Sequence, residues 1–147
     1  MTTPATTAPP PHRFWRAGVG HYRAAALLEQ KEPGPADHLA GISAECALKA
    51  ILIDFLGSQD NGNKAPMHPK TGNHGHVDKL WPQLAQLAQG RVGAALLPLI
   101  AHNPFAGWKV DHRYEDGSAI QAADLAVHIQ MAQALCVLYD DARNGRI

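Results

Sequence analysis

The sequence predicts an all-α fold: a small bundle with two long N-terminal helices, a shorter middle section and one long C-terminal helix. Apolar residues recur with helical spacing in the long segments, and no segment shows the alternation of apolar and polar residues that is typical of a strand. The chain has 147 residues, which suits one domain with a buried core.

The N-terminal segment, residues 1–11, consists of Thr, Ala and Pro after the first Met. Such a segment cannot bury a core, so we expect a disordered tail and a folded domain over residues 12–147. The first helix is expected from His12 to Lys31, because the following KEPGP stretch interrupts helical structure.

The second helix is expected from Pro35 to Phe55. Proline suits the first turn of a helix, where its missing N–H has no partner to lose, and Gly57 lies just past the other end as a stop signal. Residues 58–76 then form a long polar loop that is rich in Gly, Pro, Asn and His.

The middle section and the last helix follow this loop. Residues 77–88 and 91–100 predict two short helices, the first interrupted at Pro82, and residues 101–117 are irregular. Ser118 and Gln121 form an S-x-x-Q capping box, so the last helix is expected to begin at Ser118 and to run to about Arg143.

The charge and composition of the chain limit the kinds of function that it can have. Lys plus Arg equals Asp plus Glu, 13 each, so no net positive field attracts nucleic acid, although a local basic patch can still form. Cys46 and Cys136 lie in apolar helical patterns and are expected to pack as small hydrophobic side chains. No signal peptide, membrane-spanning stretch or cofactor motif is visible, so we expect a cytoplasmic protein without a cofactor and without a membrane contact.

Glu45 and Lys49 interrupt the apolar second helix at a spacing of four residues, the favourable order for a helical ion pair. Because Leu52 and Leu56 share their sector of the helix, we expect the pair to be partly buried. A buried carboxylate needs a second partner, for which Arg113 is the candidate. The pair is then either a structural ion pair or part of a ligand or nucleic-acid site.

The segment HRYEDG, residues 112–117, is the densest group of functional side chains. The Arg113 guanidinium suits a carboxylate or a phosphate, and Tyr114 can stack on a base or pack against the protein. His112, Arg113 and Tyr114 are therefore the catalytic candidates. The alternative is that Arg113 only anchors this loop to Glu45.

The polar loop carries His68, His74 and His76, and neutral imidazole is a common ligand of zinc or nickel. No Cys or Glu accompanies them, and a tight site needs a fourth ligand on a rigid frame. We therefore expect no specific metal site there.

The order of these segments resembles the HEPN superfamily. The resemblance rests on HYRAAALLEQ, DHLAGISAECALKAIL, HVDKLWPQL and FAGWKVDHRYEDG, which includes Trp108, and on the long last helix. It covers most of the chain from His12 onward. It implies a four- or five-helix up-and-down bundle, a homodimer through the long helices, and a role in toxin–antitoxin, phage-defence or CRISPR systems or beside nucleotidyltransferases.

Many HEPN members are metal-independent ribonucleases that carry Arg, four to six residues and then His near the C-terminal part of the bundle. After Arg113, positions 118 to 120 are Ser, Ala and Ile, so that motif is not in place. The literal match, Arg16 to His21, lies in the first helix. Its two residues are five positions apart, which places their side chains about 140 degrees apart around the helix axis.

Two functions therefore remain open. The first is a module that binds RNA or a partner protein encoded nearby, through a polar cluster that can also be structural. The second is a ribonuclease whose site forms across a homodimer from the catalytic candidates, together with His21 or Glu45. The candidate polar cluster consists of Glu45, Lys49, His38, Arg113, Trp108 and His21.

Overall fold

The computed structural model describes residues 9–147, and residues 1–8 of the expected tail lie outside this range. The described chain is mostly helical, which confirms the predicted all-α class. The long helices are α1 (Arg13–Leu28), α2 (Pro33–Phe55) and α6 (Ala122–Arg143). The short elements are β1 (Met67–His68), β2 (Gly72–Asn73), α3 (Val77–Leu80), η1 (Trp81–Gln83), α4 (Leu84–Leu87), α5 (Gly90–Ile100) and η2 (Val110–Tyr114).

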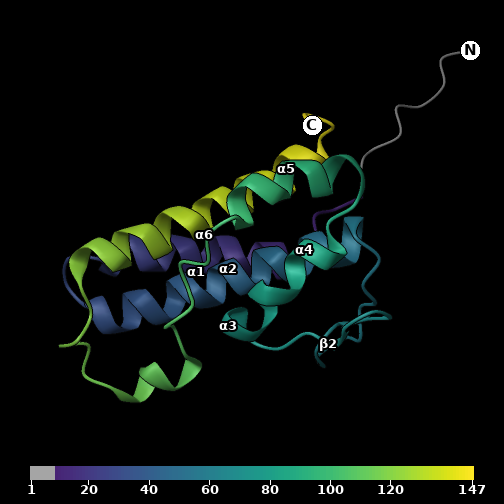
Figure 1. Cartoon of the computed structure of the whole chain (residues 1–147). Coiled ribbons are helices and arrows are strands. Elements are labelled where there is room, and N and C mark those ends of the chain that lie inside the picture. Colours follow the sequence, from purple (N-terminus) through teal and green to yellow (C-terminus); the bar gives the residue numbers. More distant parts are fainter. Residues whose placement is uncertain (1–8) are drawn as a thin grey trace, which may run out of the picture.

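The central helix of the bundle is α2, which packs against both α1 and α6 (Figure 1). Its residues are apolar on nearly all sides, as expected for a helix enclosed by others, and most of them are buried. Small residues bring α1 close: Gly18 lies against the backbone of α2, and Ser43 Oγ donates a hydrogen bond to the Gly18 carbonyl at 2.6 Å. Any polar side chain in the middle of α2 is therefore buried.

The C-terminal helix α6 is long and apolar enough to cross a membrane by length and composition alone. This corrects the expectation that no stretch of the chain reaches that limit. Its apolar residues have another role, because Leu125, Leu135 and Tyr139 are buried against the rest of the bundle. Packing in the core therefore accounts for part of this composition, since 44% of the apolar window is buried, whereas Val127 and Val137 are 47% and 50% exposed.

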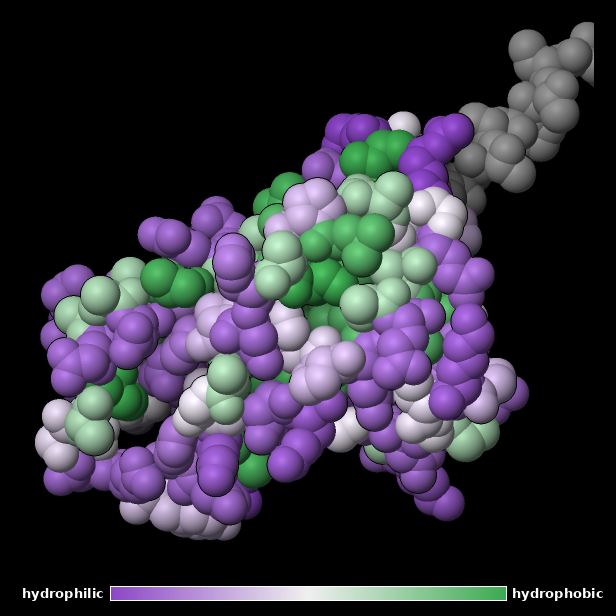
Figure 2. Space-filling model, in the orientation of Figure 1, coloured by the Kyte–Doolittle hydropathy of each residue, from purple (hydrophilic) through white to green (hydrophobic). Residues whose placement is uncertain are grey.

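The middle section follows the prediction closely. Residues 77–87 form α3, η1 and α4 in succession, with the 3₁₀ turn placed at Pro82, and α5 covers residues 90–100. Figure 2 shows apolar side chains gathered over α5. Leu97 of this helix is 46% exposed, while Val92 and Leu99 are half-buried.

Several details of the sequence prediction are wrong. Helix α1 ends at Leu28 rather than Lys31, and α2 begins at Pro33 rather than Pro35. The polar loop contains the hairpin β1–β2, whose two-residue strands are too short to show any alternation. The last helix begins at Ala122 and not at Ser118. The Ser118 N–H donates to Asp116 Oδ1 at 2.9 Å, and the Ile120 N–H donates to the Gly117 carbonyl at 3.1 Å. Residues 116–120 therefore form a turn, and Ser118 is not the N-terminal cap of the helix.

Candidate functional site

Trp108 fixes the loop that carries η2 to the central helix. Its indole Nε1 donates to the Asp37 carbonyl at 3.0 Å, and the ring is 1% exposed. The indole lies directly on Gly41, where any Cβ would overlap it. The His38 ring stacks on the indole with centroids 6.0 Å apart. The absence of a side chain at Gly41 therefore allows the Trp108 indole, and with it η2, to pack against α2.

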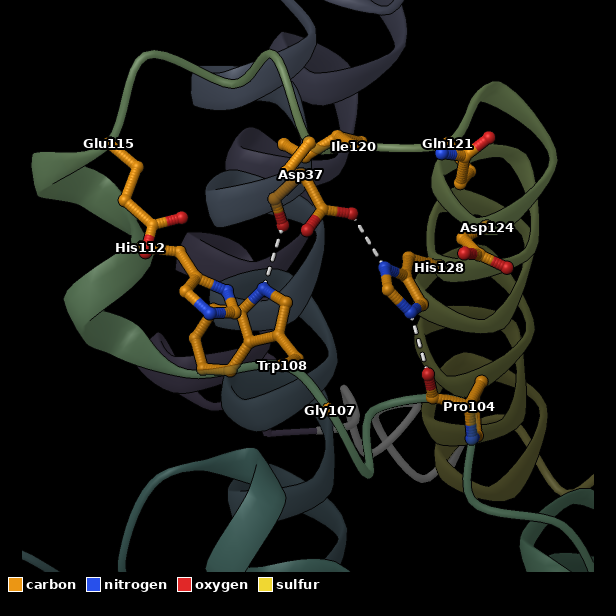
Figure 3. Close-up of a pocket in the computed structure, with 11 residues that line it drawn as sticks. Asp37, Pro104, Gly107, Trp108, His112, Glu115, Ile120, Gln121, Asp124 and His128 are labelled. Carbon is orange, nitrogen blue, oxygen red and sulfur yellow. Dashed lines mark hydrogen bonds and ion pairs between the residues drawn. The ribbon is translucent and has the colours of Figure 1, made fainter.

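A second link joins α2, α6 and the loop before Trp108 (Figure 3). His128 Nδ1 lies 2.6 Å from Asp37 Oδ1, and its Nε2 lies 2.6 Å from the Pro104 carbonyl oxygen. Burial lowers the pKa of His128, but the hydrogen bond and charge of Asp37 and the hydrogen bond to Pro104 outweigh it, so the pKa is raised above 6.5. With both ring nitrogens near acceptors, the protonated imidazole is the form that this site favours.

We expect this link to make stability depend on pH. Because the folded pKa of His128 is raised, its contribution is present below about pH 6.5, the unfolded value, and is lost as the pH rises through the folded pKa. The melting temperature of the protein minus that of a His128→Gln variant should therefore fall between about pH 6 and 9. Thermal unfolding of both proteins across that range measures it, and a difference that grows with pH would contradict the assignment.

A pocket of about 330 Å³ lies between η2, α2 and α6 (Figure 3). His112 and Trp108 line one side of it, and Glu115 and Asp124 contribute carboxylates. His112 is half-buried, and its Nδ1 accepts a hydrogen bond from the Lys109 N–H at 3.4 Å. Among the three catalytic candidates from the sequence, His112 is the one that faces this pocket.

Arg113 and Tyr114 lie on the outside of η2. The Arg113 Cζ atom is 4.6 Å from the centroid of the Tyr114 ring, and the ring belongs to a side chain that is 77% exposed. The guanidinium also donates to the Val110 carbonyl at 3.4 Å. Within residues 9–147 it has no carboxylate partner, so the expected contact between Arg113 and Glu45 is not formed.

Arg113 instead lies near His38 of α2, which also has His21 of α1 in its surroundings. Burial lowers the pKa of His38, and the charges of Arg113 and His21 lower it further. Part of the predicted polar cluster therefore does come together, from α1, α2 and the η2 loop. We call this group the η2 cluster; it consists of His21, His38, Trp108, Arg113 and Tyr114.

Glu45 and Lys49 belong to a separate network. Both are buried, at 7% and 8% exposure, and Lys49 Nζ donates to Glu45 Oε2 at 2.9 Å. The second partner of the carboxylate is His76, whose Nδ1 lies 3.0 Å from Glu45 Oε1. The same oxygen accepts the Val77 N–H at 3.1 Å, where an anion is favourable because α3 begins there.

The three histidines of the polar loop have separate partners. His68 Nε2 lies 3.1 Å from the Leu56 carbonyl oxygen, and His74 Nε2 lies 2.7 Å from Ser58 Oγ. His76 pairs with Glu45. In the described part of the chain, no group of three His, Cys, Asp or Glu side chains is arranged to hold a metal ion.

Sequence reasoning missed the roles of Asp37 and His128. Each looked like an ordinary polar residue on a long helix, and the two are separated by 91 positions. The available signal was the apolar neighbourhood of His128, because Leu125, Ile129 and Ala132 all point inward on the same helix. A histidine on such a face needs a buried partner.

The chain matches no protein-family model, no curated protein and no solved structure. Its function is therefore inferred from the η2 cluster and from the pocket beside it.

Proposed function

We propose that the chain is an HEPN-like helical module that binds single-stranded RNA through η2. The observation that carries this proposal is the exposed Tyr114 ring with the Arg113 guanidinium stacked on it. An exposed aromatic ring offers a stacking platform for a base, and a guanidinium without a carboxylate partner among the described residues offers donors to a phosphate.

The setting of η2 supports this assignment. Loops held by a rigid scaffold are common binding sites, and the Trp108 contact with Gly41 holds η2 against α2. The order of the helices supports the resemblance to the HEPN superfamily, and with it a role in a prokaryotic defence or toxin–antitoxin system.

The test is RNA binding by the full chain with η2 altered. Tyr114→Ala should weaken binding of a labelled single-stranded RNA by about tenfold, because base stacking contributes roughly 1–3 kcal/mol. Arg113→Ala should weaken binding and reduce the slope of log affinity against log salt by about one. Fluorescence anisotropy at several salt concentrations measures both effects.

The matched control is Arg91→Ala, which removes an exposed arginine from α5, away from η2. It should leave the affinity within about twofold of the unaltered protein. Equal losses for Arg91→Ala and Arg113→Ala would contradict a specific η2 site. An affinity that does not respond to Tyr114→Ala would contradict base stacking.

A ribonuclease is the second candidate, favoured by His112, which lines the pocket next to Arg113. Because Nδ1 accepts the Lys109 N–H, the neutral His112 ring carries its proton on Nε2 and can donate a hydrogen bond to a scissile phosphate. Cleavage also needs a base that takes the ribose 2′-hydroxyl proton as the 2′-oxygen attacks phosphorus, and an acid that protonates the leaving 5′-oxygen. His128 has both ring nitrogens engaged, so in this reading a second copy of the chain supplies the missing groups. Cutting in EDTA that His112→Ala abolishes supports this reading, and intact RNA contradicts it.

A homodimer is part of the proposal, because the resemblance implies one. That dimer would form through the long helices, and the apolar residues of α5, among which Leu97 is 46% exposed, offer a separate surface that a partner protein can cover (Figure 2). This surface is distinct from η2, so binding of RNA and protein contact do not compete for the same residues.

A further inference from the structure

A second pocket, of about 450 Å³, lies between the start of α1, the middle of α2 and the loop after α2. Its lining includes the side chains of Arg13, Phe14, Lys49, Lys64 and His76. None of the described residues that line it carries a carboxylate. The pocket therefore presents basic groups and one aromatic ring to whatever enters it.

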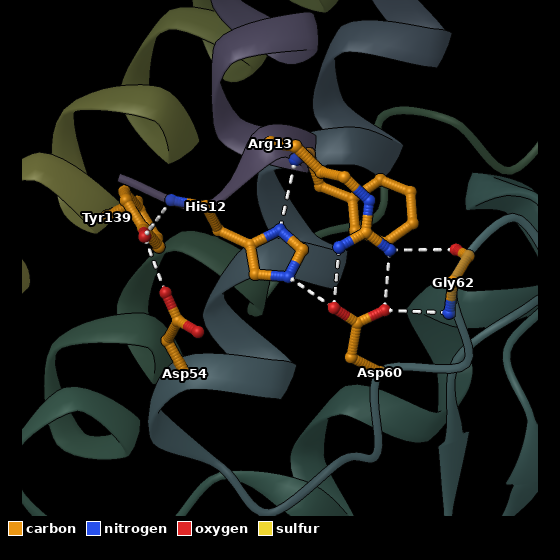
Figure 4. A network of polar contacts seen from close by, with 7 residues as sticks. His12, Arg13, Asp54, Asp60, Gly62 and Tyr139 are labelled. Carbon is orange, nitrogen blue, oxygen red and sulfur yellow. Dashed lines mark hydrogen bonds and ion pairs between the residues drawn. The ribbon is translucent and has the colours of Figure 1, made fainter. Parts of the chain in front are cut away.

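The wall at Arg13 is held in place by Asp60 (Figure 4). The two guanidinium nitrogens donate to the two carboxylate oxygens at 2.6 and 2.5 Å, and one of them also donates to the Gly62 carbonyl at 2.8 Å. The hydrogen bonds from Arg13 hold the pKa of Asp60 well below its usual range. This bidentate pair joins the loop after α2 to the start of α1 and fixes the shape of the pocket.

The charges around the pocket do not cancel. Three cationic side chains line it, Arg13, Lys49 and Lys64, whereas the two carboxylates that neutralise Arg13 and Lys49 lie behind them. Three positive charges minus two negative ones leave an excess of one positive charge. This excess suits an anion.

Lys49 forms the buried part of the site. Its ammonium has three donors, and within residues 9–147 it makes one hydrogen bond, to Glu45. Lys49 is only 8% exposed and it lines the pocket, so a molecule in the pocket is a suitable partner for its remaining donors. Buried donors are stabilised by acceptors, and an oxyanion supplies several at once.

We propose that this pocket binds a phosphate monoester, with the phosphate on Lys49 and Lys64 and the organic part along Phe14. A phosphate monoester carries about −1.5 to −2 charges and three strong acceptor oxygens, which match the excess charge and the free donors. The volume of about 450 Å³ is larger than a phosphate ion requires. The half-buried Phe14 ring provides an apolar wall for the part of the pocket that the phosphate does not fill. This site shares no residue with the η2 cluster and does not depend on RNA binding there.

The test uses phenyl phosphate as the probe, with inorganic phosphate and phenol as comparisons. Titration of the full chain, followed by NMR, should shift the His76 imidazole and the Lys49 side chain with phenyl phosphate. Inorganic phosphate should bind about tenfold more weakly, because it makes no contact with Phe14. Phenol should produce no shift at Lys49. The absence of shifts up to about 10 mM phenyl phosphate would overturn the proposal.

Variants distinguish the pocket from general surface charge. Lys64→Ala should weaken phenyl phosphate binding at least about threefold, whereas Lys70→Ala removes an exposed lysine of the same loop that does not line the pocket and should change nothing. Glu45→Gln combined with Lys49→Met keeps both side chains close in size and should abolish binding. Tyr114→Ala should leave it intact. Equal effects of Lys64→Ala and Lys70→Ala would overturn the assignment.

Discussion

Gly41→Ala is expected to destabilise the protein by about 3 kcal/mol, although it adds only one methyl group. The new Cβ overlaps three atoms of the Trp108 indole, which is 1% exposed and is held by its hydrogen bond to the Asp37 carbonyl. Overpacking of a rigid aromatic contact forces either the ring or the backbone to shift. For a chain of this size the melting temperature should fall by roughly 6–12 °C, measured by circular dichroism or calorimetry.

Gly20→Ala is the matched control, because Gly20 also lies within a helix but has open space where the Cβ would be placed. Alanine is the better helix former by about 1 kcal/mol, so this variant should be as stable as the unaltered protein or more so. A loss of stability at Gly20 equal to that at Gly41 would show that the indole contact is not the cause. Gly41→Ala should also weaken RNA binding, since the same contact positions η2.

The helical class and most element boundaries could be predicted from the sequence, because they depend on local chemistry. Pro35 in the first turn of α2, Gly57 after its end and Pro82 in the middle section act on the backbone within a few residues, although α2 begins two residues before Pro35. Ser118 shows where such reasoning fails. In a capping box the Ser118 N–H would donate to the Gln121 side chain, but here it donates to Asp116 Oδ1. Residues 116–120 form a turn instead, and the helix begins at Ala122.

The site could be predicted less well, because its contacts join distant parts of the chain. The burial of Glu45 follows from its helical sector, but the choice between Arg113 and His76 as its partner depends on how the loop after α2 folds back. The Asp37–His128 pair depends on the packing of α2 against α6 in the same way. Spacing along one helix carries no information on either pairing.

Glu45→Ala is expected to destabilise the protein by about 3–5 kcal/mol, because it leaves the Lys49 ammonium buried without its counter-charge. The change also removes the acceptor of the Val77 N–H at the start of α3 and the partner of the His76 ring. Lys49→Met should cost less, since the remaining carboxylate still has His76 and the Val77 N–H as partners. Chemical denaturation of the two single variants measures the difference.

The double variant, Glu45→Gln with Lys49→Met, measures what the intact ion pair contributes to the free energy of unfolding. Each single variant instead measures the cost of leaving one charge buried without its partner. Both charges are removed together, and the glutamine oxygen can still accept the Val77 N–H, so its stability should lie within about 1–2 kcal/mol of the unaltered protein. If the double variant is as unstable as Glu45→Ala, the pair itself holds the fold together. If it is stable and has lost phenyl phosphate binding, the buried charges serve the pocket rather than the core, since a neutral core of the same shape folds without them.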